Sequence, residues 1–221
     1  MPALYVLLFL LAFVLIGVGV WFNARRRKEL STWANARGFH FASTRVRHFD
    51  DQHSEFRCLQ RGHSRYAYNI SQGAQGGRSV MAFDYHYATG SGKHRHDYRF
   101  SGVLLSSDVA LKPLAIRPEN VLDKVSEFFG ADDIDFESAA FSRRFHVTGP
   151  DKRWAYDVIH QRTMEFLLSM PVFSIEFGSR SVLVWRSRRF SSQSFDEAIE
   201  VAGGILDRLP DYVLRQQKGV T

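Results

Sequence analysis

The chain has 221 residues, of which 45% are apolar and 14% aromatic, and it carries a net charge of +6. This apolar content is sufficient for a packed core and excludes an intrinsically disordered chain. The single cysteine, Cys58, excludes an intrachain disulfide. Part of the positive charge lies in one run, Arg25–Lys28, and the rest of the chain is too nearly balanced to predict nucleic-acid binding.

An uncharged apolar segment, Ala3–Phe22, lies near the start of the chain. As a helix, its 20 residues would span about 30 Å, which matches the hydrocarbon core of a bilayer. Tyr5 and Trp21 lie near its two ends, where aromatic rings favour the headgroup region. The alternative is a cleaved signal peptide, but no Lys or Arg precedes the run, which is also longer than a signal needs. We therefore predict one transmembrane helix.

The basic flank of this segment predicts its orientation. Arg25, Arg26, Arg27 and Lys28 follow the apolar run at once, and no basic side chain precedes it. The positive-inside rule then leaves the N-terminus outside and the following domain in the cytoplasm, at the inner (cytoplasmic) membrane. The same four residues could attract anionic lipid. We expect residues 1–29 to be the anchor with its flank.

Residues 30–221 are expected to form one cytoplasmic domain, with a weak internal boundary near 113–118. Leu30, Trp33 and Ala34 lie at helical spacing, so a short helix should continue from the membrane and stop near Arg37. Between this helix and the boundary, the apolar pattern is mostly that of strands. Strands are predicted at 55–60, 65–71, 79–87 and 97–106, with a glycine-rich loop at 73–77 and a hairpin connection at 88–96.

The second half of the domain mixes helices and strands. Helices are predicted at 118–130, at 151–168 and from a capping box at Ser194 onward. Strands are predicted at 141–147, 172–177 and 181–186, the last two flanking a turn. The predicted fold class is therefore α+β, with one N-terminal transmembrane helix followed by an antiparallel-sheet domain with at least three helices.

The stretch Phe141–Trp185 resembles an uncharacterised domain-of-unknown-function family of bacterial membrane-anchored proteins. The matching features are the strand Phe141–Val147, then Asp151, a helix with Met164, and the hairpin Phe173–Trp185. The resemblance implies bacterial origin and membrane attachment, and it implies no reaction or ligand.

One candidate metal site is built from histidines. Asp84, His86, His94 and His96 lie close together in the sequence. Alternate residues of a strand point to one face, so Asp84 could share a face with His86, and His94 with His96. Imidazole and carboxylate groups are zinc ligands. The interpretation that we favour is a solvated hairpin tip, because the neighbouring Lys93 would repel a metal ion.

A second candidate metal site is acidic. Asp133, Asp135 and Glu137 would align on one face of a strand, and three carboxylates could hold Mg²⁺ or Ca²⁺. The spacing fails the calcium-loop pattern, which requires Gly and Glu where this chain has Ser138 and Arg144. We favour instead that these acids pair with basic residues of neighbouring strands.

The absence of a catalytic motif favours a non-catalytic function. Neither G-x-S-x-G nor H-E-x-x-H occurs in the sequence. We therefore predict a membrane-tethered module that binds a membrane or cytoplasmic protein or the membrane surface, and we expect no cofactor. The alternative is a metal-dependent hydrolase that uses the histidine or carboxylate cluster. A third hypothesis is a lipid sensor that uses Arg25–Lys28 and Arg186–Arg189.

Overall fold

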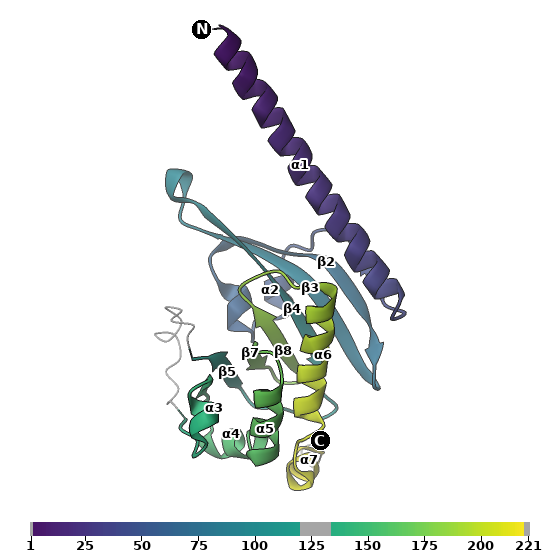
Figure 1. The fold of residues 1–221 in the computed structure, drawn as a ribbon. Helices are drawn as coiled ribbons and strands as arrows, with labels where there is room; N and C mark the ends of the chain where they lie inside the picture. Colours follow the sequence, from purple (N-terminus) through teal and green to yellow (C-terminus); the bar gives the residue numbers. More distant parts are fainter. Residues whose placement is uncertain (1, 120–133, 219–221) are drawn as a thin grey trace.

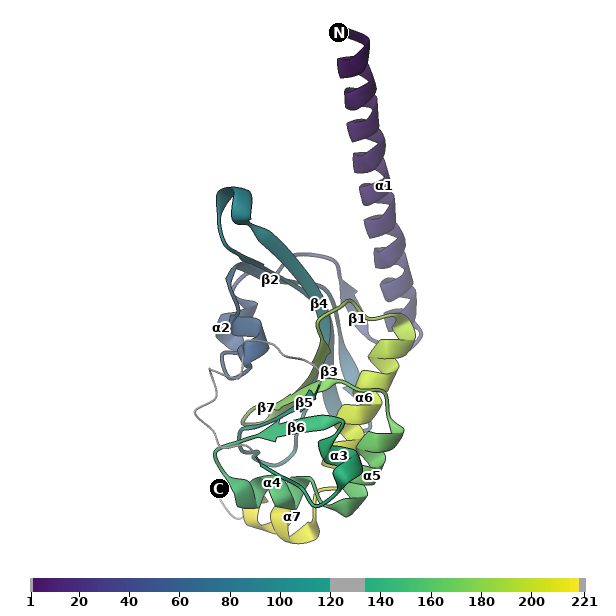
Figure 2. The ribbon, with the colours of Figure 1, turned by 60° about the vertical axis from the view of Figure 1, so that its left-hand side comes forward.

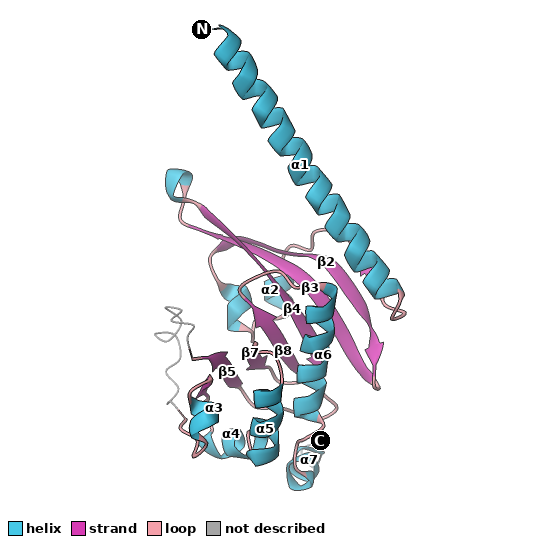
Figure 3. Ribbon diagram, in the orientation of Figure 1, coloured by secondary structure: helices cyan, strands magenta, loops and turns pink. Residues whose placement is uncertain are grey.

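The computed structural model describes residues 2–119 and 134–218, and it has an eight-stranded antiparallel sheet with helices on both faces (Figure 1; Figure 3). The strand order is β1-β2-β3-β4-β8-β7-β5-β6, and this arrangement confirms the predicted α+β class. The strands are β1 (His40–Ala42), β2 (His63–Gln75), β3 (Arg78–Thr89), β4 (His96–Ser106), β5 (Leu114–Pro118), β6 (Phe145–Thr148), β7 (Ser174–Phe177) and β8 (Ser181–Arg186).

The N-terminal helix α1 (Pro2–Asn35) is continuous from the apolar segment into the domain. It is long and apolar enough to cross a membrane, and its apolar stretch is not buried in the domain. Its last turns behave differently, since Leu30, Trp33 and Ala34 are buried in the core. The short helix predicted after the apolar segment is therefore confirmed as the end of α1, and no linker separates it from that segment.

The long hairpins of the first half follow the predicted strands. Strands β3 and β4 contain the predicted strands 79–87 and 97–106, and they pair from Val80–Leu105 to Thr89–His96. The glycine-rich loop is shorter than predicted, because only Gly76 and Gly77 form the turn between β2 and β3. Both have positive φ, as a two-residue hairpin turn of this type requires.

Two predictions in this half were wrong. The segment predicted as a strand at 55–60 contains the 3₁₀ helix η1 (Arg57–Gln60), which follows the short helix α2 (Phe49–Gln52). Gly73 belongs to β2 and not to the loop, because its missing side chain leaves room for the ring of Phe39. A Cβ atom at this position would lie 2.1 Å from that ring.

In the second half, the helices differ in detail from the predictions. The predicted helix at 151–168 is two helices, because Ile159 leaves the helical conformation and His160 caps the next segment. Ser191 caps the last long helix, so this helix begins before the predicted capping box at Ser194. The helices are α3 (Ala139–Ser142), α4 (Lys152–Val158), α5 (Gln161–Ser169), α6 (Ser192–Leu206) and α7 (Asp211–Lys218).

Pro118 ends β5 and does not open a helix, so the predicted boundary segment 113–118 contributes a strand to the common sheet. The rest of the predicted helix at 118–130 lies outside the described residues apart from Glu119, and Asp133 lies outside them as well. The strand predicted at 141–147 is divided between α3 and β6.

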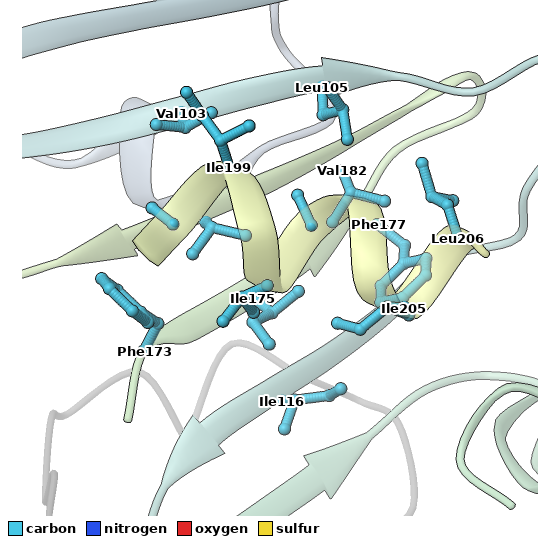
Figure 4. Close-up of a cluster of buried hydrophobic side chains, with 14 of the residues drawn as sticks. Val103, Leu105, Ile116, Phe173, Ile175, Phe177, Val182, Ile199, Ile205 and Leu206 are labelled. Atoms are coloured by element: carbon cyan, nitrogen blue, oxygen red, sulfur yellow. The ribbon is translucent and has the colours of Figure 1, made fainter. Parts of the chain in front are cut away.

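The sheet separates two hydrophobic cores. The larger core joins the end of α1 and the apolar stripe of α6 to one face of the sheet, where Ile199 and Ile205 lie over Val103, Ile175 and Val182 (Figure 4). The smaller core lies on the other face beneath α2 and η1, and it is mostly aromatic. Because the end of α1 contributes to the larger core, the helix that contains the apolar segment is part of the domain's own packing.

The hairpin of β3 and β4 extends beyond the body of the domain. Its tip points to the same side as the N-terminal half of α1, and the two views agree on this direction (Figure 1; Figure 2). The tip contains the 3₁₀ helix η2 (Gly92–His94), and its side chains from Gly92 to Asp97 are exposed. The β3–β4 hairpin and the apolar segment of α1 therefore extend from the same side of the domain.

Candidate functional site

The α1-facing surface of the sheet becomes polar beyond the reach of α6. Register pairs Tyr68 with Asp84 and Asp84 with Ser101, so these side chains form one row across β2, β3 and β4. On the same strand β3, Val80 and Ala82 belong to the larger core. Asp84 is therefore a fully buried carboxylate that lies between Ala82 and His86 on this face of the strand.

Arg26 of α1 neutralises this carboxylate. Its Nε donates to one Asp84 oxygen at 2.8 Å and its Nη2 donates to the other at 2.6 Å, a bidentate geometry. Its Nη1 donates to the carbonyl oxygen of Phe190 at 3.0 Å, which connects the segment before α6 to the same group. The side chain of Arg26 is 14% exposed and that of Asp84 is 0% exposed. A predicted member of the membrane flank is thus an internal ion-pair partner.

Two further donors complete the environment of Asp84. Asn69 Nδ2 donates at 2.9 Å and Ser101 Oγ donates at 2.5 Å. Asn69 has a φ of 50° and lies where the β2–β3 register shifts, and such a bulge redirects a side chain. Burial, and then the nearby Asp84 carboxylate, raise the pKa of Tyr68 to about 12, so this phenol stays protonated at neutral pH.

The contacts of Asp84 are those of a structural ion pair. Both oxygens of Asp84 accept hydrogen bonds from Arg26, Asn69 and Ser101, so the carboxylate has little capacity left to bind a metal ion. Breaking such a pair would leave an uncompensated buried charge. The site therefore fixes α1 against the sheet.

His86 lies on the same face of β3 but belongs to a different network. Its Nε2 lies 2.9 Å from Asp97 Oδ1 and its Nδ1 lies 3.1 Å from the carbonyl oxygen of Ser64. Its ring stacks on Tyr66 with a centroid distance of 4.6 Å. Arg95 also binds Asp97, at 2.8 Å. These contacts brace the base of the projecting hairpin, and they keep His86 apart from the Asp84 network.

Asp97 should make the free energy of unfolding depend on pH in the acidic range. The Arg95 and His86 hydrogen bonds lower the pKa of Asp97 to about 2. A lowered pKa stabilises the folded state above the unfolded-state value of about 4, and this contribution is lost as pH falls towards 2. We expect Asp97→Asn to flatten the pH dependence of the urea midpoint between about pH 4 and 2. If the urea midpoint changed equally with pH in the variant and the wild type, the ionised Asp97 would not stabilise the folded state.

The other predicted metal ligands do not converge in the structure. His94 and His96 are exposed at the hairpin tip, and Asp135 and Glu137 are exposed in a segment that is not a strand. Within the described ranges 2–119 and 134–218, no group of three or more His, Cys, Asp or Glu side chains is arranged to hold a metal ion. The predicted alignment of Asp135 and Glu137 on a strand was wrong, because these residues lead into α3 through a turn.

The remaining basic residues of the flank are accessible. Arg25, Arg27 and Lys28 are exposed, whereas Arg26 is turned into the domain. The guanidinium group of Arg25 lies 5.5 Å from the ring centroid of Trp21, which is a cation–π distance. The sequence analysis assigned Arg25–Lys28 as a whole to the membrane flank, and it did not distinguish Arg26 from the other three residues. It missed the roles of Asn69 and Ser101, because no sequence pattern indicates that either residue contacts Asp84.

Cys58 is a buried thiol of the smaller core. Burial is the largest of the effects that raise the pKa of this thiol well above its usual value. The nucleophilic thiolate is therefore scarce, and we expect Cys58 to react slowly with thiol reagents in the folded protein.

Among solved structures, the fold is similar to the crystal structure of the mycobacterial trehalose monomycolate transport factor A, TtfA. The TM-score is 0.61 at 15% sequence identity, and the match covers 83% of this chain and 93% of that chain. At this identity the likeness shows a shared fold. No protein-family model and no curated protein matches the chain. The resemblance of Phe141–Trp185 to a membrane-anchored family stays a prediction.

Proposed function

We propose that this protein is a membrane-anchored, non-catalytic interaction module in which the anchor and the sheet are one rigid unit. In this proposal Ala3–Phe22 crosses the inner membrane and the domain lies on the cytoplasmic side, as the basic flank favours. The observation that carries the proposal is the buried pair of Arg26 and Asp84. Its partner would be a protein or lipid at the membrane surface.

The physical argument starts from what a simple tether requires. A tether needs only a flexible linker, but α1 continues without a break into the core. A buried ion pair often adds little net stability, because desolvation offsets the attraction of the charges. Such a pair does select one arrangement, since any other leaves a buried charge unpaired. Arg26 and Asp84 would therefore hold the sheet at one orientation to the bilayer.

A fixed orientation would keep one surface of the domain towards the membrane. The β3–β4 hairpin points along the N-terminal half of α1, and its exposed tip includes Lys93 and Arg95 (Figure 2). Basic side chains are attracted to the anionic inner leaflet. A solved protein of similar fold is named a transport factor, which agrees with a binding role. The hydrolase alternative has less support, since Asp84 is occupied by Arg26 and His86 contacts Asp97.

Fluorescence quenching in vesicles tests this proposal. The full-length chain is labelled either at Ser91→Cys in the hairpin or at Ser169→Cys at the end of α5, and Cys58 stays unlabelled because it is buried. Spin-labelled lipid headgroups should quench the hairpin label several-fold more strongly than the α5 label. Equal quenching at both positions would mean that the domain has no fixed orientation, and it would refute the rigid unit.

A further inference from the structure

A cavity of about 320 Å³ lies where α1 meets the domain, at the end of the apolar segment. Phe22, Arg25, Arg26 and Glu29 of α1 line one side of it. Arg189, from the segment between β8 and α6, lines the other. The cavity therefore joins the last apolar residue of the predicted span to arginines that are far apart in the sequence.

Two of these three arginines are available to a ligand. Arg26 is occupied by Asp84 and the carbonyl oxygen of Phe190. Arg25 and Arg189 are exposed, and neither has an ion-pair partner among residues 2–119 and 134–218. The one acid of the cavity, Glu29, accepts a hydrogen bond from Ser192 Oγ at 3.1 Å.

The chemistry of this cavity fits the headgroup of an anionic phospholipid. Guanidinium groups bind phosphate oxygens through paired hydrogen bonds, and Arg25 and Arg189 approach the cavity from two elements. Phe22 supplies an apolar wall at the depth where acyl chains begin. A free phosphate ion would gain nothing from this apolar wall, so a lipid is the better match.

We infer that Arg25 and Arg189 form a binding site for one anionic phospholipid headgroup, an inference that rests on the proposed membrane anchoring. Of the basic residues in Arg25–Lys28 and Arg186–Arg189, the structure indicates which can bind the headgroup. Arg186 is excluded because its Nε already donates to the carbonyl oxygen of Val172. The contact of Arg25 with Trp21 is different, since it uses the face of the guanidinium group and not its N–H donors. The bound lipid would bridge α1 and the loop before α6, next to the Arg26–Asp84 pair.

Native mass spectrometry of the full-length chain tests this site. The protein is released from detergent micelles that contain equal amounts of phosphatidylglycerol and phosphatidylcholine. We expect one phosphatidylglycerol to be retained in preference, and Arg25→Gln with Arg189→Gln to reduce this preference. The ratio of retained phosphatidylglycerol to phosphatidylcholine should fall about fivefold for each arginine replaced. This factor corresponds to about 1 kcal/mol per basic residue at a membrane surface.

The matched control is Arg27→Gln with Lys28→Gln, which removes the same charge from exposed positions of α1 outside the cavity. An equal loss in the control would refute the site in favour of diffuse attraction, and so would a wild type without preference. Competition by added inorganic phosphate would identify a free anion as the ligand and refute the lipid. If the hairpin label is still quenched more than the α5 label, the rigid module stands even when the lipid site fails.

Discussion

Replacing Arg26 by methionine is expected to destabilise the domain by about 3–5 kcal/mol, because it leaves Asp84 buried without a counter-charge. Methionine keeps much of the side-chain length, so the loss reports the charge and its hydrogen bonds more than packing. The measurement is denaturant unfolding of the full-length chain in detergent micelles, followed by near-ultraviolet circular dichroism.

Two comparisons separate the ion pair from a general effect of charge. Arg27→Met on the exposed side of α1 should change the free energy of unfolding by less than about 0.5 kcal/mol. The double variant Arg26→Met with Asp84→Leu should recover part of the stability, since no unpaired charge remains. Strictly additive effects of the two substitutions would mean that Arg26 and Asp84 are not coupled, and the basis of the rigid unit would be lost.

Replacing Trp33 by alanine is expected to cost about 3–5 kcal/mol in the free energy of unfolding. Trp33 is 5% exposed and lies on α1 among the residues of the larger core. Its ring contacts Phe195 at a centroid distance of 5.1 Å, and its Nε1 donates to Asp196 Oδ1 at 3.0 Å. Truncation would leave a cavity and remove one of the contacts that join α1 to α6.

The matched control for this variant lies on the same helix. Trp21→Ala changes the same residue type, but Trp21 is 54% exposed and lies outside the domain core. Its substitution should leave the free energy of unfolding of the domain within about 0.5 kcal/mol of the wild type. If both variants had the same midpoint as the wild type, the end of α1 would not belong to the folded domain.

Local patterns were sufficient for the strands with clear alternation. The faces of β3 follow from the sequence, since Phe83 and Tyr85 lie in the smaller core while Val80 and Ala82 lie in the larger one. This works because successive side chains of a strand point to opposite faces, whatever the strand packs against. The turn at 178–180 was found for the same reason, from two alternating runs with a glycine between them.

Predictions failed where a distant contact decided the local conformation. The helix predicted at 151–168 breaks at Ile159, and the ring of His160 contacts the carbonyl oxygen of Arg208 at 2.8 Å. A contact with a residue 48 positions away is not visible in helical periodicity. The 3₁₀ helix η1 is a similar case, since Glu176 on β7 accepts from the backbone N–H of Arg57.

The sequence by itself determined the apolar helix, its basic flank and the α+β class, because hydrophobic length and periodicity are properties of neighbouring residues. From the sequence, Asp84 was interpreted only as a candidate metal ligand, and no ion-pair partner was predicted for it. Only the tertiary structure decided that this partner is Arg26, 58 residues earlier, and that Arg25 and Arg189 meet at one cavity. These pairings depend on how α1 crosses the sheet, and the packing of the whole domain sets that geometry.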